Sequence, residues 1–195
     1  MSYSSYKSVI RVMTNEEKDI INGCKRGDQS SQEQLYRTYG PIVKAVCYRY
    51  VGYKTEEAQD LFHDIIVMIL TNIHSFKTES SIKSWIYRIS VNKCIDYLRC
   101  QSVRKTELDD DMMNYPSSER LNETLTMDQL VEIINTLPVN QKLAFNLYEV
   151  EGYNEQEIVK IMGMTPTNVR TLISRAKQSL RNRIQAYLGK EIDIL

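Results

Sequence analysis

Four side chains suited to contact with a nucleic acid recur along one predicted helix in the middle of the chain. The helix begins near Ser81 or Ser84 and runs through the sequence SWIYRISVNKCIDYLR. At 100° per residue, four of its side chains fall within about 60° of one another: Trp85, Arg88, Asn92 and Arg99. An indole stacks on an unpaired base for about 1–3 kcal/mol, and a guanidinium neutralises phosphate or stacks in turn. An ordinary helix with its tryptophan in the core would show the same pattern, so the stripe alone leaves both interpretations open.

A second polar face lies near the C-terminus, on a predicted helix that opens at Thr165-Pro166. Its apolar residues form one stripe: Val169, Leu172, Ile173, Ala176, Leu180 and Ile184. Opposite or beside this stripe lie Asn168, Arg170, Thr171, Ser174, Arg175, Lys177 and Gln178. A helix that enters the major groove needs such side chains to contact base edges and phosphates. A helical bundle with a polar surface is the alternative.

The segment before this helix favours DNA binding over a plain bundle. Asn154 caps a short helix, Gly163 ends it, and Thr165-Pro166 opens the longer basic helix. A short helix, a turn containing glycine and a longer basic helix form the helix-turn-helix pattern.

One helical face combines carboxylates with a histidine: Glu57, Asp60, His63 and Asp64. A carboxylate three residues before a histidine is half of a di-iron site, which needs a second Glu-x-x-His and two further carboxylates. Only His74 remains, and its neighbours do not supply that pattern. We therefore expect this face to meet solvent or another protein, with no metal, no cofactor and no catalytic residue.

Helical periodicity and capping signals predict which elements position these residues. The first half holds four predicted helices, at 16–27, 32–50, 56–73 and from 81 or 84 to 99. Pro41 lies inside the second, so we expect a kink or break near Gly40. In the second half, a turn at 130–137 and a helix at 141–150 precede the helix-turn-helix. The predicted fold is all-α, with two small helical domains, the second a four-helix domain.

The composition agrees with a helical, globular chain. Of 195 residues, 42% are apolar and 26% charged, with only 7 glycines and 4 prolines. No apolar run approaches the roughly 20 residues that span a bilayer, and the start, MSYSSYKSVIRV, lacks the apolar core of a signal peptide. The cysteines have no paired spacing and are expected to be small buried hydrophobes: Cys24, Cys47, Cys94 and Cys100. We expect a cytoplasmic protein.

The net charge of zero hides an uneven distribution. Residues 1–105 have a balance of +5, residues 106–135 a balance of −7, and residues 136–195 a balance of +2. The acidic joint contains ELDDD and NYPSS, which have the composition of a linker. It could be a solvated spacer or have an active role.

The chain resembles the bacterial sigma factors of the extracytoplasmic-function group, across about residues 16–105 and 127–188. GDQSSQEQLYRTYGPIVKAVCYRY resembles the first conserved segment of sigma domain two, and EEAQDLFHDIIVMILTNIHSF resembles its polymerase-docking helix. SIKSWIYRISVNKCIDYLR resembles the helix that holds the melted minus-ten element. LPVNQKLAFNLYEVEGYNEQEIVKIMGMTPTNVRTLISRAKQSLR resembles domain four, which reads the minus-thirty-five element. The resemblance implies an alternative sigma factor that binds core RNA polymerase and directs promoter-specific initiation.

The resemblance also implies a role for particular positions. Core polymerase would contact Asp60, Leu61, His63, Asp64, Ile65 and Met68. The minus-ten strand would contact Lys77, Thr78, Glu79, Ser80, Ser81, Trp85, Arg88, Asn92 and Arg99. The minus-thirty-five duplex would contact Asn168, Arg170, Thr171, Ser174, Arg175 and Lys177.

The implied organisation is a tail at 1–13, domain two at 14–105, a linker at 106–126, domain four at 127–188 and a tail at 189–195. The implied partners are the clamp and flap of core RNA polymerase, promoter DNA as single strand and duplex, and an anti-sigma factor.

The chain departs from the family at Gln59, His63-Asp64 and Leu172, where the family usually has Glu, Gln-Glu and often Arg. Glu79 is also no natural phosphate ligand.

A stand-alone helix-turn-helix regulator that acts without polymerase is the alternative function.

Overall fold

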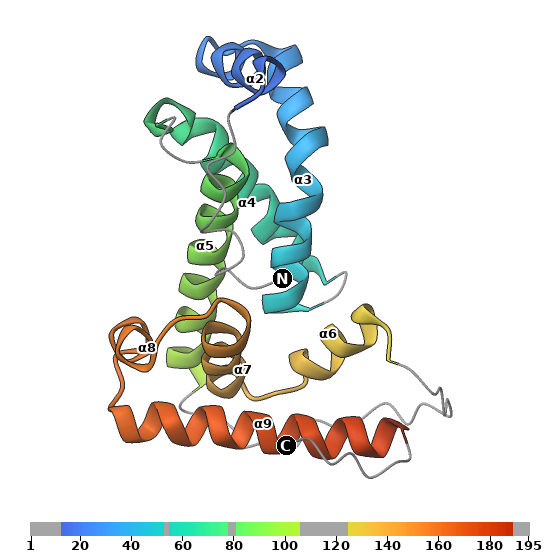
Figure 1. Ribbon diagram of the computed structural model, residues 1–195, viewed down its shortest axis with the longest axis vertical. Coiled ribbons are helices and arrows are strands. Elements are labelled where there is room, and N and C mark those ends of the chain that lie inside the picture. Colours follow the sequence, from blue (N-terminus) through green and yellow to red (C-terminus); the bar gives the residue numbers. More distant parts are fainter. Residues whose placement is uncertain (1–12, 53–54, 78–80, 106–124, 189–195) are drawn as a thin grey trace. The chain divides into compact units, whose positions relative to one another are not determined.

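The computed structural model describes residues 13–52, 55–77, 81–105 and 125–188 (Figure 1). Within these ranges all regular secondary structure is helical, so the predicted all-α class is confirmed. None of the described helices is long and apolar enough to cross a membrane. The chain divides into two compact units after Asp96, which lies inside one long helix.

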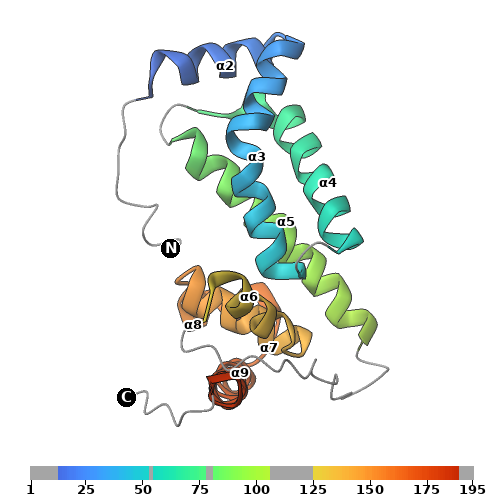
Figure 2. The ribbon, with the colours of Figure 1, turned by 90° about the vertical axis from the view of Figure 1, so that its right-hand side faces the viewer.

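The first unit contains the four helices that the sequence predicts, apart from the end of the last one, which lies beyond Asp96. They are α2 (Asn15–Lys25), α3 (Gln29–Val51), α4 (Glu56–Asn72) and α5 (Ile82–Lys105), with a 3₁₀ turn (Ile73–Ser75) after α4. Helices α3, α4 and α5 form a bundle, and α2 lies across one end of α3 (Figures 1 and 2). Thr14, Asp28 and Thr55 cap α2, α3 and α4, because their side chains accept hydrogen bonds from otherwise unpaired N–H groups.

Of the kink or break expected near Gly40, the break does not occur, because α3 continues through Gly40 and Pro41 as one helix. Its buried stripe runs on both sides of the proline, with Leu35 and Tyr39 before it and Val43 and Val46 after it. Pro41 itself is exposed. Burial of a continuous apolar stripe therefore outweighs the one backbone hydrogen bond that the proline removes.

Trp85 belongs to the core of the first unit. Its side chain is 7% exposed, and its ring meets Phe76 edge-on with 5.5 Å between the ring centroids. Phe76 follows the 3₁₀ turn, and its carbonyl oxygen accepts a hydrogen bond from Lys25 Nζ at 3.4 Å. Arg88 and Asn92, on the same stripe of α5, are exposed. The stripe is therefore divided between core and surface, unlike the shared surface that its helical spacing suggests.

Three of the four cysteines behave as the sequence predicts. Cys24, Cys47 and Cys94 are buried, whereas Cys100 is exposed. Burial, and then the negative charge of Asp28, raise the pKa of the Cys24 thiol. Cys24 is therefore a poor nucleophile in the folded chain.

In the second unit, three short helices pack along one long helix. They are α6 (Met127–Asn135), α7 (Val139–Phe145), which continues as a π-helix (Asn146–Val150), and α8 (Glu155–Met162). The long helix is α9 (Pro166–Leu188), seen end-on in Figure 2. The helix predicted at 141–150 thus exists, with its second half in π geometry.

The apolar stripe predicted for α9 forms the core of this unit. Val169, Ile173, Ala176 and Leu180 are buried. Leu172 and Ile184, the other two members of the stripe, are half-buried. The C-terminal part of the stripe packs on α6 and the turn after it, and this apolar burial is what fixes the rotation of α9 about its own axis.

The helix-turn-helix geometry is also confirmed. Asn154 Oδ1 accepts from the Glu157 N–H at 3.0 Å, and Glu157 Oε2 accepts from the Asn154 N–H at 2.8 Å. Gly163 ends α8 with φ of 65°, in the left-handed region that favours glycine. Thr165 Oγ1 then accepts from the Asn168 N–H at the start of α9.

Trp85→Ala is expected to lower the free energy of unfolding of the first unit by about 3–5 kcal/mol, because it empties a core site filled by an indole. Urea unfolding followed by far-ultraviolet circular dichroism measures this change. Arg88→Ala, on the exposed part of the same stripe, is the control, and we expect its effect to stay within about 0.5 kcal/mol. Equal small effects of the two substitutions would contradict a core role for Trp85.

Asp28→Ala is expected to destabilise the first unit at neutral pH, and to matter less in acid. Asp28 Oδ2 accepts from the Ser31 hydroxyl at 2.6 Å and from the Ser31 N–H at 2.8 Å, and these bonds hold the pKa of Asp28 below its ordinary value. A carboxyl group whose folded-state pKa is lowered stabilises the fold above its ordinary pKa of about 3.9, and this contribution is lost as the pH falls.

Thermal unfolding of the wild type and of Asp28→Ala at a series of pH values measures this dependence. Asp28→Asn is the matched control, because asparagine caps a helix without titrating. A difference between wild type and Asp28→Ala that is the same at every pH would contradict the prediction.

Candidate functional site

Helix α4 presents three of the six residues predicted to contact polymerase. Asp60, His63 and Asp64 are exposed, and Met68 is half-buried. Leu61 and Ile65 are 4% and 0% exposed, so they belong to the core and support the helix from beneath. A partner could therefore touch fewer residues of α4 than the sequence predicts.

The same face of α4 carries an exposed apolar residue, Val67, which the sequence did not single out. Val67 is 62% exposed and lies three and four residues after Asp64 and His63, so it shares their face. Asp64 also has a partner within the unit, because its Oδ2 lies 3.6 Å from Lys93 Nζ on α5. The face therefore combines an uncovered apolar side chain with charged neighbours, which suits a protein contact.

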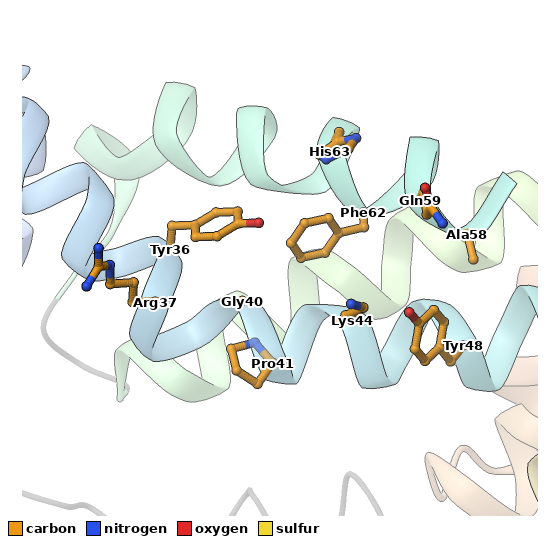
Figure 3. A pocket seen from close by; sticks show the side chains of 10 residues that line it. All are labelled: Tyr36, Arg37, Gly40, Pro41, Lys44, Tyr48, Ala58, Gln59, Phe62 and His63. Carbon is orange, nitrogen blue, oxygen red and sulfur yellow. The ribbon is translucent and has the colours of Figure 1, made fainter. Parts of the chain in front are cut away.

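A pocket of about 540 Å³ opens between α3 and α4 beside this face (Figure 3). Tyr36 and Phe62 meet across it edge-on, with 5.8 Å between their ring centroids. Phe62 also lies 5.4 Å from the His63 ring. The other lining residues are Arg37, Gly40, Pro41, Lys44, Tyr48, Ala58 and Gln59. The pocket brings a predicted docking residue, His63, together with aromatic residues that the sequence did not single out.

The chemistry of this pocket suits one apolar side chain of a partner. Its aromatic walls can cover an apolar group, and Tyr36 is 45% exposed. None of its described lining residues is acidic, whereas Arg37 and Lys44 bring positive charge. Lys44 Nζ lies 5.6 Å from the Tyr48 ring centroid, and Arg37 pairs with Glu33 on the exposed surface. An aromatic pocket with a cationic edge is typical of an interface anchor site.

Helix α5 presents three of the predicted minus-ten residues to solvent: Arg88, Asn92 and Arg99. Lys77 is also exposed, and Ser81 opens the helix, with its hydroxyl accepting from the Ser84 N–H at 3.1 Å. Trp85 is buried and packs edge-on against Phe76, so its ring is not exposed for stacking on a base. Thr78, Glu79 and Ser80 lie outside the described residues.

All six predicted duplex-contacting residues of α9 are exposed: Asn168, Arg170, Thr171, Ser174, Arg175 and Lys177. The Thr171 hydroxyl donates to the Thr167 carbonyl oxygen at 2.9 Å. Arg175 has no ion pair among the residues that the structure describes. The buried stripe thus directs the whole predicted face toward solvent.

Two cations of this face are paired with acids that the sequence analysis did not consider. Arg170 Nε donates to Glu155 Oε2 at 2.8 Å, and this hydrogen bond and charge raise the pKa of Arg170. Lys177 Nζ lies 2.5 Å from Glu149 Oε1 and 5.3 Å from the centroid of the Tyr148 ring. Sequence spacing gives no signal for these pairs, because each joins two different helical segments.

The carboxylate–histidine face of α4 does not form a group of metal ligands in the part of the chain that the structure describes. No group of three His, Cys, Asp or Glu side chains able to hold a metal ion occurs within the described ranges.

Two family models match separate parts of the chain. Sigma-70 region 2 matches residues 35–104, which include α4 and α5, and Sigma-70 region 4 matches residues 127–180, which include the helix-turn-helix. The match to region 2 does not favour a stand-alone helix-turn-helix regulator, because such a protein needs no polymerase-binding part.

Relatives match almost the whole chain. The ECF RNA polymerase sigma-E factor of Haemophilus influenzae is 30% identical over an alignment of 179 residues, which covers 85% of this chain and 94% of that protein. The sigma-E factor of Escherichia coli is 27% identical, over 88% of this chain and 95% of that protein. The sigma factor RpoE of Bartonella quintana, solved with the anti-sigma factor NepR, is 19% identical with a TM-score of 0.46, over 78% of this chain and 96% of that one. The protein therefore belongs to the ECF sigma factors of the sigma-70 family, alternative sigma factors that direct promoter-specific transcription.

Proposed function

We propose that the two units divide the work of initiation between them. Residues 14–105 form the domain that docks on core polymerase and holds the melted minus-ten element. Residues 127–188 form the domain that reads the minus-thirty-five element, and residues 106–126 connect the two. The protein has no catalytic residue of its own, acts in the cytoplasm and leaves nucleotidyl transfer to polymerase. Residues 106–126 would act as a solvated spacer or have an active role. A further partner would be an anti-sigma factor.

The polymerase-docking surface in this proposal is the exposed face of α4 together with the pocket between α3 and α4. This combination carries the proposal, because a protein that only binds duplex DNA has no use for an aromatic pocket on its other unit. Asp60, His63 and Asp64 would meet the polymerase directly, and the pocket would take an apolar anchor. Leu61 and Ile65 would act by holding the helix in place.

The minus-ten strand would lie along the exposed part of α5. Arg88, Asn92 and Arg99 offer cations and an amide for phosphates and bases. Flipping a base out of the duplex costs a few kcal/mol, which such contacts can offset. Trp85 contributes by supporting α5, since its ring is buried and not exposed for stacking on a base.

Transcription reconstituted from purified parts tests this function. Core RNA polymerase from the source bacterium is supplied with sheared genomic DNA, with and without the protein. New discrete transcripts that depend on the protein and share two spaced upstream elements are expected. Tight duplex binding by the protein alone, without new transcripts, would instead indicate a stand-alone regulator.

Tyr36→Ala is expected to weaken binding to core polymerase by about 1–2 kcal/mol, because truncation removes an aromatic wall of the pocket. Titration of labelled protein with core polymerase measures the affinity, and thermal unfolding checks the fold. Tyr36→Phe retains the ring and is the matched control. Unchanged affinity for Tyr36→Ala would remove the pocket from the docking surface.

Arg175→Ala is expected to weaken contact with the upstream promoter element by about 1–3 kcal/mol, as for a lost base-specific contact. Footprinting of the polymerase complex on a promoter found in the transcription experiment measures this loss. Lys18→Ala, an exposed cation of α2, removes the same charge from the other unit and serves as the control. A footprint of unchanged strength would exclude Arg175 from recognition of this element.

A further inference from the structure

The two paired cations of α9 point to a role for their acidic partners. We infer that Glu149 and Glu155 act as internal counter-ions, which compete with DNA phosphate for Lys177 and Arg170 and so keep sequence-independent DNA binding weak. Lys177 Nζ lies 2.5 Å from Glu149 Oε1, and Arg170 Nε lies 2.8 Å from Glu155 Oε2. The inference rests on the proposed contact between α9 and the promoter duplex.

The geometry concentrates this competition on one edge of the DNA-facing surface. Arg170 and Lys177 are seven residues apart, which places them within about 20° of each other and about 10 Å apart along the helix. Arg175 lies about 140° from Arg170 around the helix. The acids therefore neutralise one edge of the surface, and the part that includes Arg175 stays available for base contacts.

The segment that carries Glu149 has unusual backbone geometry. Tyr148 and Glu149 both lie in the π-helix Asn146–Val150, and π turns are frequent at functional sites. Asn146 opens this segment with a fully buried side chain whose amide has no hydrogen-bond partner among the described residues. The fold thus retains a buried amide without a hydrogen-bond partner, which costs stability, in the same π-helix from which Tyr148 and Glu149 contact Lys177.

Counter-ion competition acts on the electrostatic part of DNA binding. A protein cation that neutralises a phosphate releases condensed salt ions, and this release provides nearly all of sequence-independent affinity. A lysine already neutralised by a carboxylate must first give up that partner, so it contributes less. Base contacts at the correct promoter are unaffected, because they depend on hydrogen bonding in the groove. Weak binding elsewhere matters because competing genomic sites are very numerous.

Binding of the full-length chain to a mixed-sequence duplex, at several salt concentrations, tests the inference. Glu149→Gln and Glu155→Gln are each expected to tighten binding about two- to fivefold at low salt, since exposed ion pairs contribute up to about 1 kcal/mol and about 1.4 kcal/mol is tenfold. The slope of log affinity against log salt is expected to steepen by up to about 0.9 for each cation released.

Glu132→Gln is the matched control, because it removes one exposed negative charge from α6 of the same unit. The double variant Glu149→Gln/Lys177→Ala is expected to bind no tighter than Lys177→Ala does by itself, apart from the small change that Glu132→Gln also produces. Circular dichroism checks that every variant is folded.

The outcomes separate this inference from the proposed duplex contact. If Glu149→Gln weakens binding, the acid positions Lys177 for DNA and the inference is wrong. If Glu149→Gln matches Glu132→Gln while Lys177→Ala still weakens binding, the inference alone fails. If neither Lys177→Ala nor Arg175→Ala changes duplex binding, the proposed contact of α9 with DNA fails as well.

Discussion

The unpaired N–H groups at helix starts constrain this fold more than any other feature, because half of its described α-helices are too short to be stable alone. Isolated helices below about 12–15 residues are marginal in water, and α2, α6, α7 and α8 have 11, 9, 7 and 8 residues. Three of these four begin with a reciprocal capping box: Thr14 with Glu17, Thr126 with Gln129, and Asn154 with Glu157. The caps fix where each connection turns, and so decide which stripe of the next helix reaches the core.

The functional surfaces follow from this arrangement and from the distribution of charge. A chain with zero net charge has no overall attraction to a polyanion, so its cations must act locally. On α9 the buried stripe directs the cations outward. On α5 the arginines Arg88 and Arg99 are exposed, whereas Trp85 on the same stripe is buried. Lys93, Arg170 and Lys177 each lie beside a carboxylate of a neighbouring element. Binding at these surfaces therefore exchanges one partner for another.

Most of the fold could be predicted from local sequence, because caps, breakers and apolar periodicity act over a few residues. Asn154, Gly163 and Thr165 marked the helix-turn-helix, and the stripe of α9 indicated which face would be exposed. Prediction failed where a distant residue decides the outcome. Trp85 is buried and packs against Phe76, which follows the turn after α4, and no spacing within α5 contains that information.

The pocket and the acidic partners of α9 were missed for the same reason. The pocket needs Tyr36 and Phe62 from two helices, and its existence depends on how closely those helices approach. The pair of Glu149 with Lys177 depends on a π turn, which the apolar pattern of 141–150 does not distinguish from an α-helix. At Pro41 a local rule was outweighed by burial along the whole of α3.

The position of Trp85 restricts the tryptophan fluorescence of the protein to one of its two units. It is the sole tryptophan of the chain, it lies in the first unit, and it is buried. Indole emission shifts to longer wavelength when water reaches the ring, so the fluorescence of the whole protein reports on the packing of the first unit. The helix-turn-helix unit contains no tryptophan and so adds no indole emission of its own. The two units can therefore be followed separately in the intact chain, by comparing tryptophan emission with backbone dichroism.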